Sequence, residues 1–200
     1  MKSWKLAFTI FLLLLAATSL PMFADNVNMQ FNGTPTSNNY SGVPSYPYDL
    51  SVNGGPNQWM MCLGYYEHIS GGETWQATAV SVGSLDPNTH LLDYQAAFLF
   101  MMAVADLGAN SDINAAAWYL FEGAPYLTPG AQALVALAES QTFTQGEFSG
   151  VMLYTAIPGT ESGNLGTAQS FMGTPEPGTL ALFGSGLIGL AGMLRRKLQA

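Results

Sequence analysis

The side chain with the greatest chemical potential in this 200-residue chain is its single thiol, Cys62. One cysteine cannot form a disulfide within the chain. His68 follows six residues later, and on a continuous strand both side chains would lie on one face. A Cys–His nucleophile is therefore one interpretation of this pair. A buried, unreactive thiol is the alternative, because Gly64 can interrupt the strand between the two residues.

Carboxylates offer two further kinds of chemistry. Asp86, His90 and Asp93 could supply two carboxylates and an imidazole to a metal ion, but their spacing fits no zinc or calcium motif. The same segment is also typical of a turn before a capped helix. A glycosidase needs a pair of carboxylates, and the candidates are Glu67, Glu73, Glu122 and Glu139. Solvated surface acids are the simpler interpretation, and we expect neither a metal site nor a cofactor.

Aromatic residues make up 12% of the chain and are the third candidate. The body contains Trp59, Trp75 and Trp118 together with several clustered tyrosines. Aromatic faces among amides and carboxylates can stack on sugars. At strand and helix spacing, however, aromatic residues more often belong to a core, so we expect most of them to be buried.

These candidates lie in a body, residues 25–157, whose pattern predicts an α+β domain. Its first part is β-rich and would form a small sandwich or barrel, with strands expected at 46–52, 59–66 and 74–82. Two to three helices follow, expected at 91–107, 113–122 and 130–140. A final strand is expected at 150–157. Residues 158–174 are rich in Gly, Thr and Ser and predict a flexible linker.

The charges are distributed very unevenly. All five lysines and arginines lie within residues 1–5 or 195–197, so residues 6–194 contain no fixed cation. All thirteen carboxylates lie between Asp25 and Glu176. Such a body cannot neutralise phosphates, which excludes nucleic acid as a partner. Without lysine it also excludes P-loop and Schiff-base chemistry.

Both ends of the chain have the composition of targeting segments. Residues 1–24 combine Lys2 and Lys5 with an apolar run and a short polar stretch, the layout of a secretory signal peptide. At the other end, residues 179–194 form an apolar run that predicts a single transmembrane helix of roughly 24 Å. The basic residues 195–197 would hold the C-terminus in the cytoplasm.

The order of features at this end resembles the PEP-CTERM sorting signal. Pro175, Glu176 and Pro177 are followed by the glycine-bearing apolar run and then by Arg195 and Arg196. The resemblance covers about residues 174–198. It implies an exported envelope protein of a Gram-negative bacterium, processed by signal peptidase and by an exosortase that would cut near the Pro-Glu-Pro. The segment 175–200 is then the sorting and anchor segment, and the body passes through the inner membrane to the cell surface or matrix.

The body has a looser resemblance, over residues 43–157, to the thioester domains of bacterial surface adhesins. Cys62 after an apolar strand, a Gly-x-Thr-Trp strand at 72–75 and a helix ending in Ala-Trp-Tyr-Leu-Phe are the similar features. The resemblance implies a Cys thiol joined to a Gln amide, so that an amine on a target can attack the acyl carbon. Asn114, one methylene shorter, stands at the glutamine position, and Gln95 is a substitute outside the motif.

From the sequence we therefore expect an exported, non-enzymatic structural or interaction protein, in contact with extracellular polysaccharide in a biofilm matrix. Two alternatives remain open. One is a covalent adhesin with a thioester between Cys62 and Asn114. The other is a hydrolase that acts on matrix glycans through a pair of carboxylates.

Overall fold

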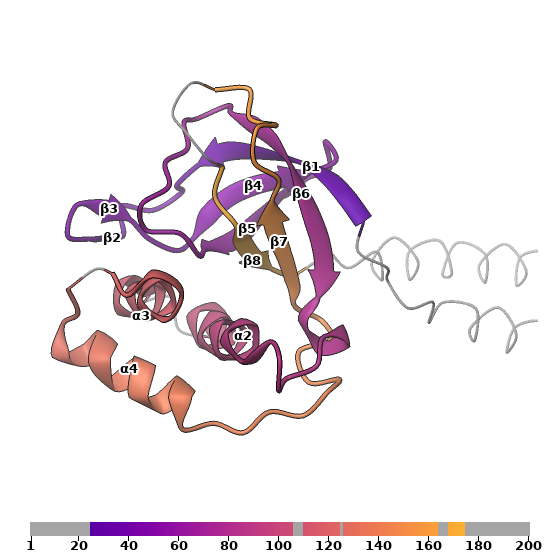
Figure 1. The fold of residues 1–200 in the computed structure, drawn as a ribbon. Helices are drawn as coiled ribbons and strands as arrows, with labels where there is room; N and C mark the ends of the chain where they lie inside the picture. Colours follow the sequence, from indigo (N-terminus) through magenta and orange to yellow (C-terminus); the bar gives the residue numbers. More distant parts are fainter. Residues whose placement is uncertain (1–24, 106–109, 125, 164–167, 175–200) are drawn as a thin grey trace, which may run out of the picture.

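A closed barrel of six strands forms one half of the body (Figure 1). The computed structural model describes residues 25–105, 110–124, 126–163 and 168–174. The barrel strands are β1 (Asp25–Gly33), β4 (Tyr48–Val52), β5 (Asn57–Cys62), β6 (Thr74–Ser81), β7 (Met152–Ala156) and β8 (Phe171–Gly173). Their order around the barrel is β1-β4-β5-β8-β7-β6, and all neighbouring pairs are antiparallel. A separate hairpin is made by β2 (Asn39–Tyr40) and β3 (Val43–Pro44).

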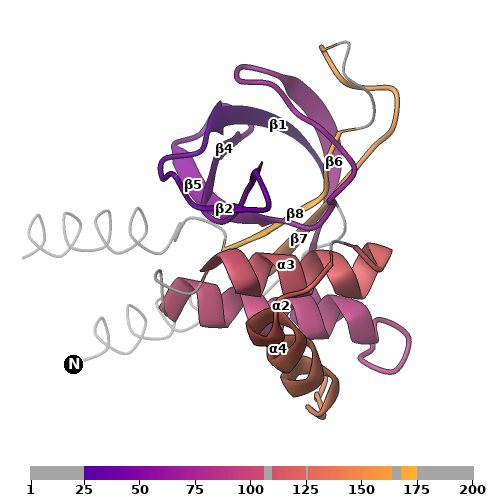
Figure 2. The same cartoon turned by 90° about the vertical axis from the view of Figure 1, so that its left-hand side faces the viewer.

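Helices cover one side of this barrel in two layers (Figure 2). They are α2 (Leu91–Ala105), α3 (Asn110–Glu122) and α4 (Pro129–Glu139), and a short 3-10 helix, η1 (Val82–Ser84), follows β6. α2 packs against β8, and α3 packs against β5 and β2. α4 packs on α2 and α3 and forms the outer layer. β5 and β8 are therefore the strands through which the barrel meets the helices.

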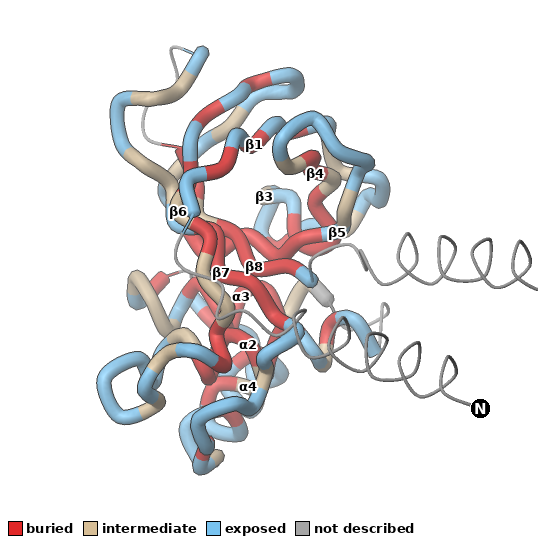
Figure 3. Tube along the Cα trace, turned by 90° about the vertical axis from the view of Figure 1, so that its right-hand side faces the viewer, coloured by how far each residue is buried: buried red, intermediate tan, exposed pale blue. Residues whose placement is uncertain are grey.

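The sequence explains both kinds of element. Along β1, Val27, Met29 and Phe31 are buried in alternation with exposed polar residues, as expected for a strand with one face in a core. Thr128 caps α4 by accepting a hydrogen bond from the Ala131 N–H. The apolar run in α2 suits a helix with packed neighbours on several sides. Figure 3 shows buried residues concentrated in β5, β7 and β8, where the barrel faces the helices.

The predicted α+β class, with a barrel-like first part followed by helices, is confirmed. All three helices begin and end within a few residues of their expected bounds. β1 was not predicted, because its segment is rich in asparagine, a residue that favours turns. The strand expected at 59–66 ends earlier, at Cys62, where Leu63 and Gly64 lead into a loop.

The flexible linker expected at 158–174 is wrong at its C-terminal end. β8 lies within it, pairs with both β5 and β7, and is needed to close the barrel. Phe171 and Met172 are completely buried. A three-residue strand is too short to give a periodic pattern, and the surrounding Gly and Thr residues obscured it. The strand expected at 150–157 is therefore β7 and not the last strand, and the folded body extends to Gly173.

The signal peptide expected at 1–24 and the transmembrane helix expected at 179–194 lie outside the described residues. Within the described part of the chain, no helix has both the length and the apolar character needed to cross a membrane.

Candidate functional site

The pairing of β5 with β8 brings a thiol and an amide together from residues 107 positions apart. Cys62 lies opposite Phe171, and the Leu63 N–H extends the pairing with a hydrogen bond of 2.9 Å to the Ser170 carbonyl. Gln169 is two residues before Phe171. Side chains two apart lie on the same face of a strand, so Gln169 is a diagonal neighbour of Cys62. A glutamine side chain is long enough to span that distance.

The two functional groups are in direct contact. Cys62 Sγ lies 3.0 Å from Gln169 Oε1 and 3.1 Å from the carbonyl oxygen of Gly64. Gln169 Nε2 donates a hydrogen bond to the backbone carbonyl of Glu67. Cys62 is fully buried and Gln169 is 6% exposed. The amide oxygen therefore faces the sulfur. Gln169 Cδ, the carbon that carries this oxygen, lies next to the atom that Cys62 Sγ contacts.

Asn114, the residue expected to face the thiol, has another place in the structure. Its Nδ2 donates a 2.8 Å hydrogen bond to the backbone carbonyl of Cys62, and its Oδ1 accepts one of 2.8 Å from the Tyr46 N–H. Asn114 thus contacts Cys62 at the backbone carbonyl and, within the described part of the chain, makes no hydrogen bond to the sulfur. Its amide holds the backbone of β5, and the amide at the sulfur belongs to Gln169. Gln95 is buried on α2, and the thiol makes no hydrogen bond to it among the described residues.

Gln169 was missed because it lies within the segment that was interpreted as a linker. One sequence signal could have found it. Residues 168–172 read Ala-Gln-Ser-Phe-Met, and a glutamine beside a short apolar run stands out in a stretch of Gly, Thr and Ser. Only the strand register, however, assigns that glutamine to Cys62.

Trp118 forms another wall of the site. Its side chain is fully buried on α3, and the Tyr65 ring packs against it with centroids 5.4 Å apart. Burial raises the pKa of the Cys62 thiol to about 12, and a favourable interaction with the Trp118 indole opposes this rise only in part. The indole Nε1 has no hydrogen-bond partner within the described residues. The thiol is thus protonated at neutral pH, and any reaction at its sulfur needs a proton acceptor.

A cavity of about 500 Å³ lies next to the loop after β5, and neither Cys62 nor Gln169 lines it. Three of its lining residues, Leu63, Gly64 and Ser170, are within two positions of Cys62 or Gln169 along the chain. Its ionisable lining residues are Glu67, His90, Asp93 and Glu122. Because residues 6–194 contain no lysine or arginine, no fixed cation from this range balances these carboxylates. The cavity is therefore acidic, and the charges of Glu67 and Glu122 also act on the buried Cys62 thiol.

Two of these carboxyls lie closest to the site. Glu122 Oε2 accepts hydrogen bonds from the Tyr65 N–H at 2.8 Å and the Tyr66 N–H at 3.3 Å, and thereby holds the loop after β5. Burial raises the pKa of Glu67, and the negative charge of Glu122 raises it further. A carboxyl group with a raised pKa beside a reactive centre is suited to proton transfer.

Comparison with protein families identifies the far end of the chain. The family model described as the PEP-CTERM protein-sorting motif matches residues 174–197. This chain ends in a PEP-CTERM motif. No curated protein and no solved structure matches the chain significantly.

The PEP-CTERM motif implies an exported protein that an exosortase processes during membrane transit towards the cell surface. The matched range contains Pro175, Glu176 and Pro177, and also Arg195 and Arg196. These residues lie outside the described part of the structure. The motif covers only the tail, so the function of the body has to be argued from its geometry.

The other chemistries considered for the body of this PEP-CTERM protein find less support. His68 is exposed, whereas Cys62 is buried and bonds elsewhere, so the structure does not assemble a Cys–His pair. Asp86 caps a turn by accepting from the Asn88 N–H, and His90 Nδ1 lies 2.9 Å from Asp93 Oδ2. No group of three or more potential metal ligands occurs in the described ranges.

The four glutamates considered as a glycosidase pair are divided between different places. Glu67 and Glu122 line the same cavity. Glu73 is buried and accepts from the Ser70 N–H, while Glu139 lines a groove on the other face of the helical layer. Only the first pair converges, and it converges beside the Cys62 thiol.

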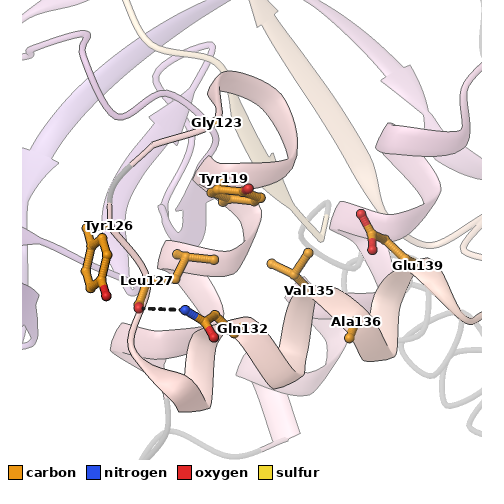
Figure 4. A pocket seen from close by; sticks show the side chains of 8 residues that line it. All are labelled: Tyr119, Gly123, Tyr126, Leu127, Gln132, Val135, Ala136 and Glu139. Atoms are coloured by element: carbon orange, nitrogen blue, oxygen red, sulfur yellow. Dashed lines mark hydrogen bonds between the residues drawn. The ribbon is translucent and has the colours of Figure 1, made fainter.

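A groove between α3 and α4, which Glu139 lines, is the second candidate binding site (Figure 4). Its volume is about 650 Å³. Tyr119 and Tyr126 stand at one side of it, 42% and 92% exposed, and Glu139 lies at the other end. Gln132 reaches across its floor and donates to the Leu127 carbonyl at 3.2 Å. Trp75 and Trp118, in contrast, are core residues, as expected for most of the aromatic residues.

Proposed function

We propose that the exported body forms an internal thioester between Cys62 and Gln169, and that it uses this bond to attach itself covalently to an amine on its target. The observation that carries the proposal is the 3.0 Å contact between Cys62 Sγ and Gln169 Oε1. The acyl partner is thus Gln169, not Asn114. Each molecule reacts once, so this function is that of a covalent adhesin and not of an enzyme.

The chemistry requires only the two side chains. The Cys62 sulfur attacks Gln169 Cδ, the C–S bond forms, the C–N bond breaks, and ammonia leaves with the thiol proton. The hydrogen bond from Gln169 Nε2 to the Glu67 carbonyl keeps the departing nitrogen on the side away from the sulfur. An incoming amine then exchanges the sulfur for nitrogen. Its nitrogen bonds to Cδ, the C–S bond breaks, and the sulfur leaves as the thiol.

Burial supports this proposal in a second way. A thioester in water hydrolyses, so a protein that stores one must exclude water until its target arrives. Cys62 is fully buried between β8, the loop after β5 and Trp118. We propose that a small amine approaches from the acidic cavity beside Gly64.

The experiment is an intact-mass measurement on the native protein isolated without amine buffers. We expect a mass lower by one ammonia and a Cys62 sulfur that iodoacetamide does not alkylate after brief unfolding in denaturant at neutral pH. Methylamine should then add its mass to residue 169 and free the thiol. An unchanged Gln169 amide together with an alkylatable thiol would contradict the proposal. Prior hydrolysis is distinguishable, because it leaves a glutamate at residue 169 in the peptide map.

The sorting signal gives a separate prediction. Replacement of Pro175, Glu176 and Pro177 by alanine should abolish exosortase processing, so the protein should retain its full C-terminal mass and stay with the inner membrane. Cell fractionation followed by mass spectrometry measures both. A Gln132→Ala variant, changed in the folded body, should be processed like the unaltered chain. Normal processing of the triple variant would show that another segment directs sorting.

Glycan binding at the groove between α3 and α4 is a second candidate function. Tyr119 and Tyr126 are exposed and line a cavity with a carboxylate and an amide, a combination that suits stacking on sugar rings. The groove and the thioester are compatible, since a glycan contact can hold the body near its target.

Loss of one stacking tyrosine should weaken glycan binding about tenfold. The variants are Tyr119→Ala and Tyr126→Ala, and retardation in gels containing the cells' own exopolysaccharide is the measurement. The exposed Tyr66, outside the groove, provides the matched control as Tyr66→Ala. Equal retardation of all three variants and the unaltered protein would remove the groove from consideration.

A further inference from the structure

We infer that the carboxyl group of Glu67 carries out proton transfer at the thioester, with Glu122 as its positioning partner. This inference rests on the proposed thioester between Cys62 and Gln169. It assigns to the acidic cavity a part in the reaction beyond that of an entrance.

Glu67 contacts Gln169 directly and reaches Cys62 through Gly64. Its backbone carbonyl accepts the hydrogen bond from Gln169 Nε2. Its carboxyl group lies over Gly64, so closely that a Cβ built on this glycine would collide with Oε2. Gly64 is also the residue whose carbonyl lies 3.1 Å from the Cys62 sulfur. Besides burial, the negative charge of Glu67 acts on the Cys62 thiol and helps to raise its pKa.

Glu122 fixes this arrangement from α3. Its Oε2 is held by the Tyr65 and Tyr66 N–H groups, and its Oε1 would lie 3.5 Å from the same Cβ on Gly64. The two carboxyl groups thus converge on one glycine. The other ionisable groups that line the cavity are His90 and Asp93, which are bound to each other.

The electrostatics of the cavity suit a proton acceptor. Burial raises the pKa of Glu67, and the charge of Glu122 raises it further. Both effects make its carboxylate a stronger base than an exposed one. The thiol has the opposite need, because burial raises the pKa of Cys62 to about 12 and makes its thiolate a poor leaving group unless a proton is delivered.

One proton satisfies both requirements. The amine nitrogen bonds to Gln169 Cδ and gives its proton to the Glu67 carboxylate. The C–S bond then breaks, and Glu67 returns that proton to the Cys62 sulfur. The products are an amide and a thiol, and Glu67 ends in its starting state. The lack of any lysine or arginine in residues 6–194 also favours a cationic amine in this cavity over an anionic nucleophile.

The test measures the rate at which methylamine opens the thioester, expressed per unprotonated amine, as a function of pH. In the unaltered protein this rate should rise with pH as Glu67 loses its proton, in a range above the usual glutamate pKa. Glu67→Gln should lower the plateau about 100-fold and remove this rise. Glu147→Gln, changed at an exposed carboxylate that lines neither the groove nor the acidic cavity, should react like the unaltered protein.

Glu122→Gln tests the same assignment without removing the proposed base. A glutamine oxygen can still accept from Tyr65 and Tyr66, but the negative charge is gone. The rise should therefore move to lower pH, because the pKa of Glu67 falls, and the plateau should stay within a few-fold. If Glu67→Gln prevents the thioester from forming, the shift of the rate–pH profile in Glu122→Gln decides the question. A Glu122→Gln variant with the same rate–pH profile as the unaltered protein overturns the inference.

The outcomes separate the two proposals. An unaltered protein that loses no ammonia and keeps an intact Gln169 amide overturns the thioester and this inference together. A protein that forms the thioester, but whose Glu67→Gln variant opens at the unaltered rate and with the unaltered pH profile, overturns the inference alone.

Discussion

Replacement of Gln169 by alanine is expected to abolish covalent capture of amines while the protein remains folded. Among the described residues, Gln169 supplies the side-chain amide that contacts the Cys62 sulfur, and the variant removes it, so the proposed acyl group is lost. Its intact mass should equal the mass calculated from the sequence, its Cys62 should be alkylated after unfolding, and methylamine should add nothing. The loss should be complete, because the bond either forms or does not form.

The control is a second glutamine. Gln132 is exposed on α4, and Gln132→Ala should retain the loss of ammonia and the reaction with methylamine. Asn114→Ala is the informative contrast. Its backbone bonds to Cys62 and Tyr46 would be lost, so the protein should be destabilised by about 1–3 kcal/mol. If Gln169→Ala still lost ammonia and Asn114→Ala did not, the acyl group would belong to Asn114 after all.

Phe171→Ala should cost about 3–5 kcal/mol of the free energy of unfolding. The Phe171 ring is fully buried. It packs edge-on against the Tyr48 ring, with centroids 5.6 Å apart, and in a tilted arrangement against Trp75, with centroids 5.9 Å apart. The cavity left by its removal would lie inside the barrel, between β8 and the rings of Tyr48 and Trp75. Urea unfolding with an unchanged slope measures this loss.

Gln76→Ala, at an exposed position of β6, is the control for this measurement and should change the stability by less than about 0.5 kcal/mol. A Phe171→Ala variant as stable as this control would mean that residues 158–174 do behave as a linker. The barrel would then be closed in some other way, and the contact between Cys62 and Gln169 would lose its structural basis.

Much of the fold could be predicted from local patterns. Thr128 before Pro129 marks the start of α4, and the apolar run at 96–105 marks a helix buried between neighbours. β1 could also have been predicted, because Val27, Met29 and Phe31 alternate with polar residues. Its asparagines were given more weight than this alternation, and in this case the period-two pattern was the better guide.

The site could not be predicted in the same way, because it depends on a register. Cys62 stands out in the sequence as the only thiol, and the structure places Asn114 of α3 on its backbone carbonyl. No local pattern connects Cys62 with a glutamine 107 residues later, since that contact exists only once β8 has closed the barrel. A buried, paired strand of three residues carries too little sequence information to be recognised alone.

The place of β8 at the end of the body has a mechanical consequence. A target joined to Gln169 is attached to the chain only five residues, 170–174, before the first of the tail residues 175–200. If the chain is held at the end that exosortase processing leaves near residue 175 and the target is pulled, the tension runs along this short covalent stretch. The other five barrel strands and all three helices lie off that path. The body can therefore unfold under load without releasing its target, so its modest size sets no limit on the force that the attachment withstands.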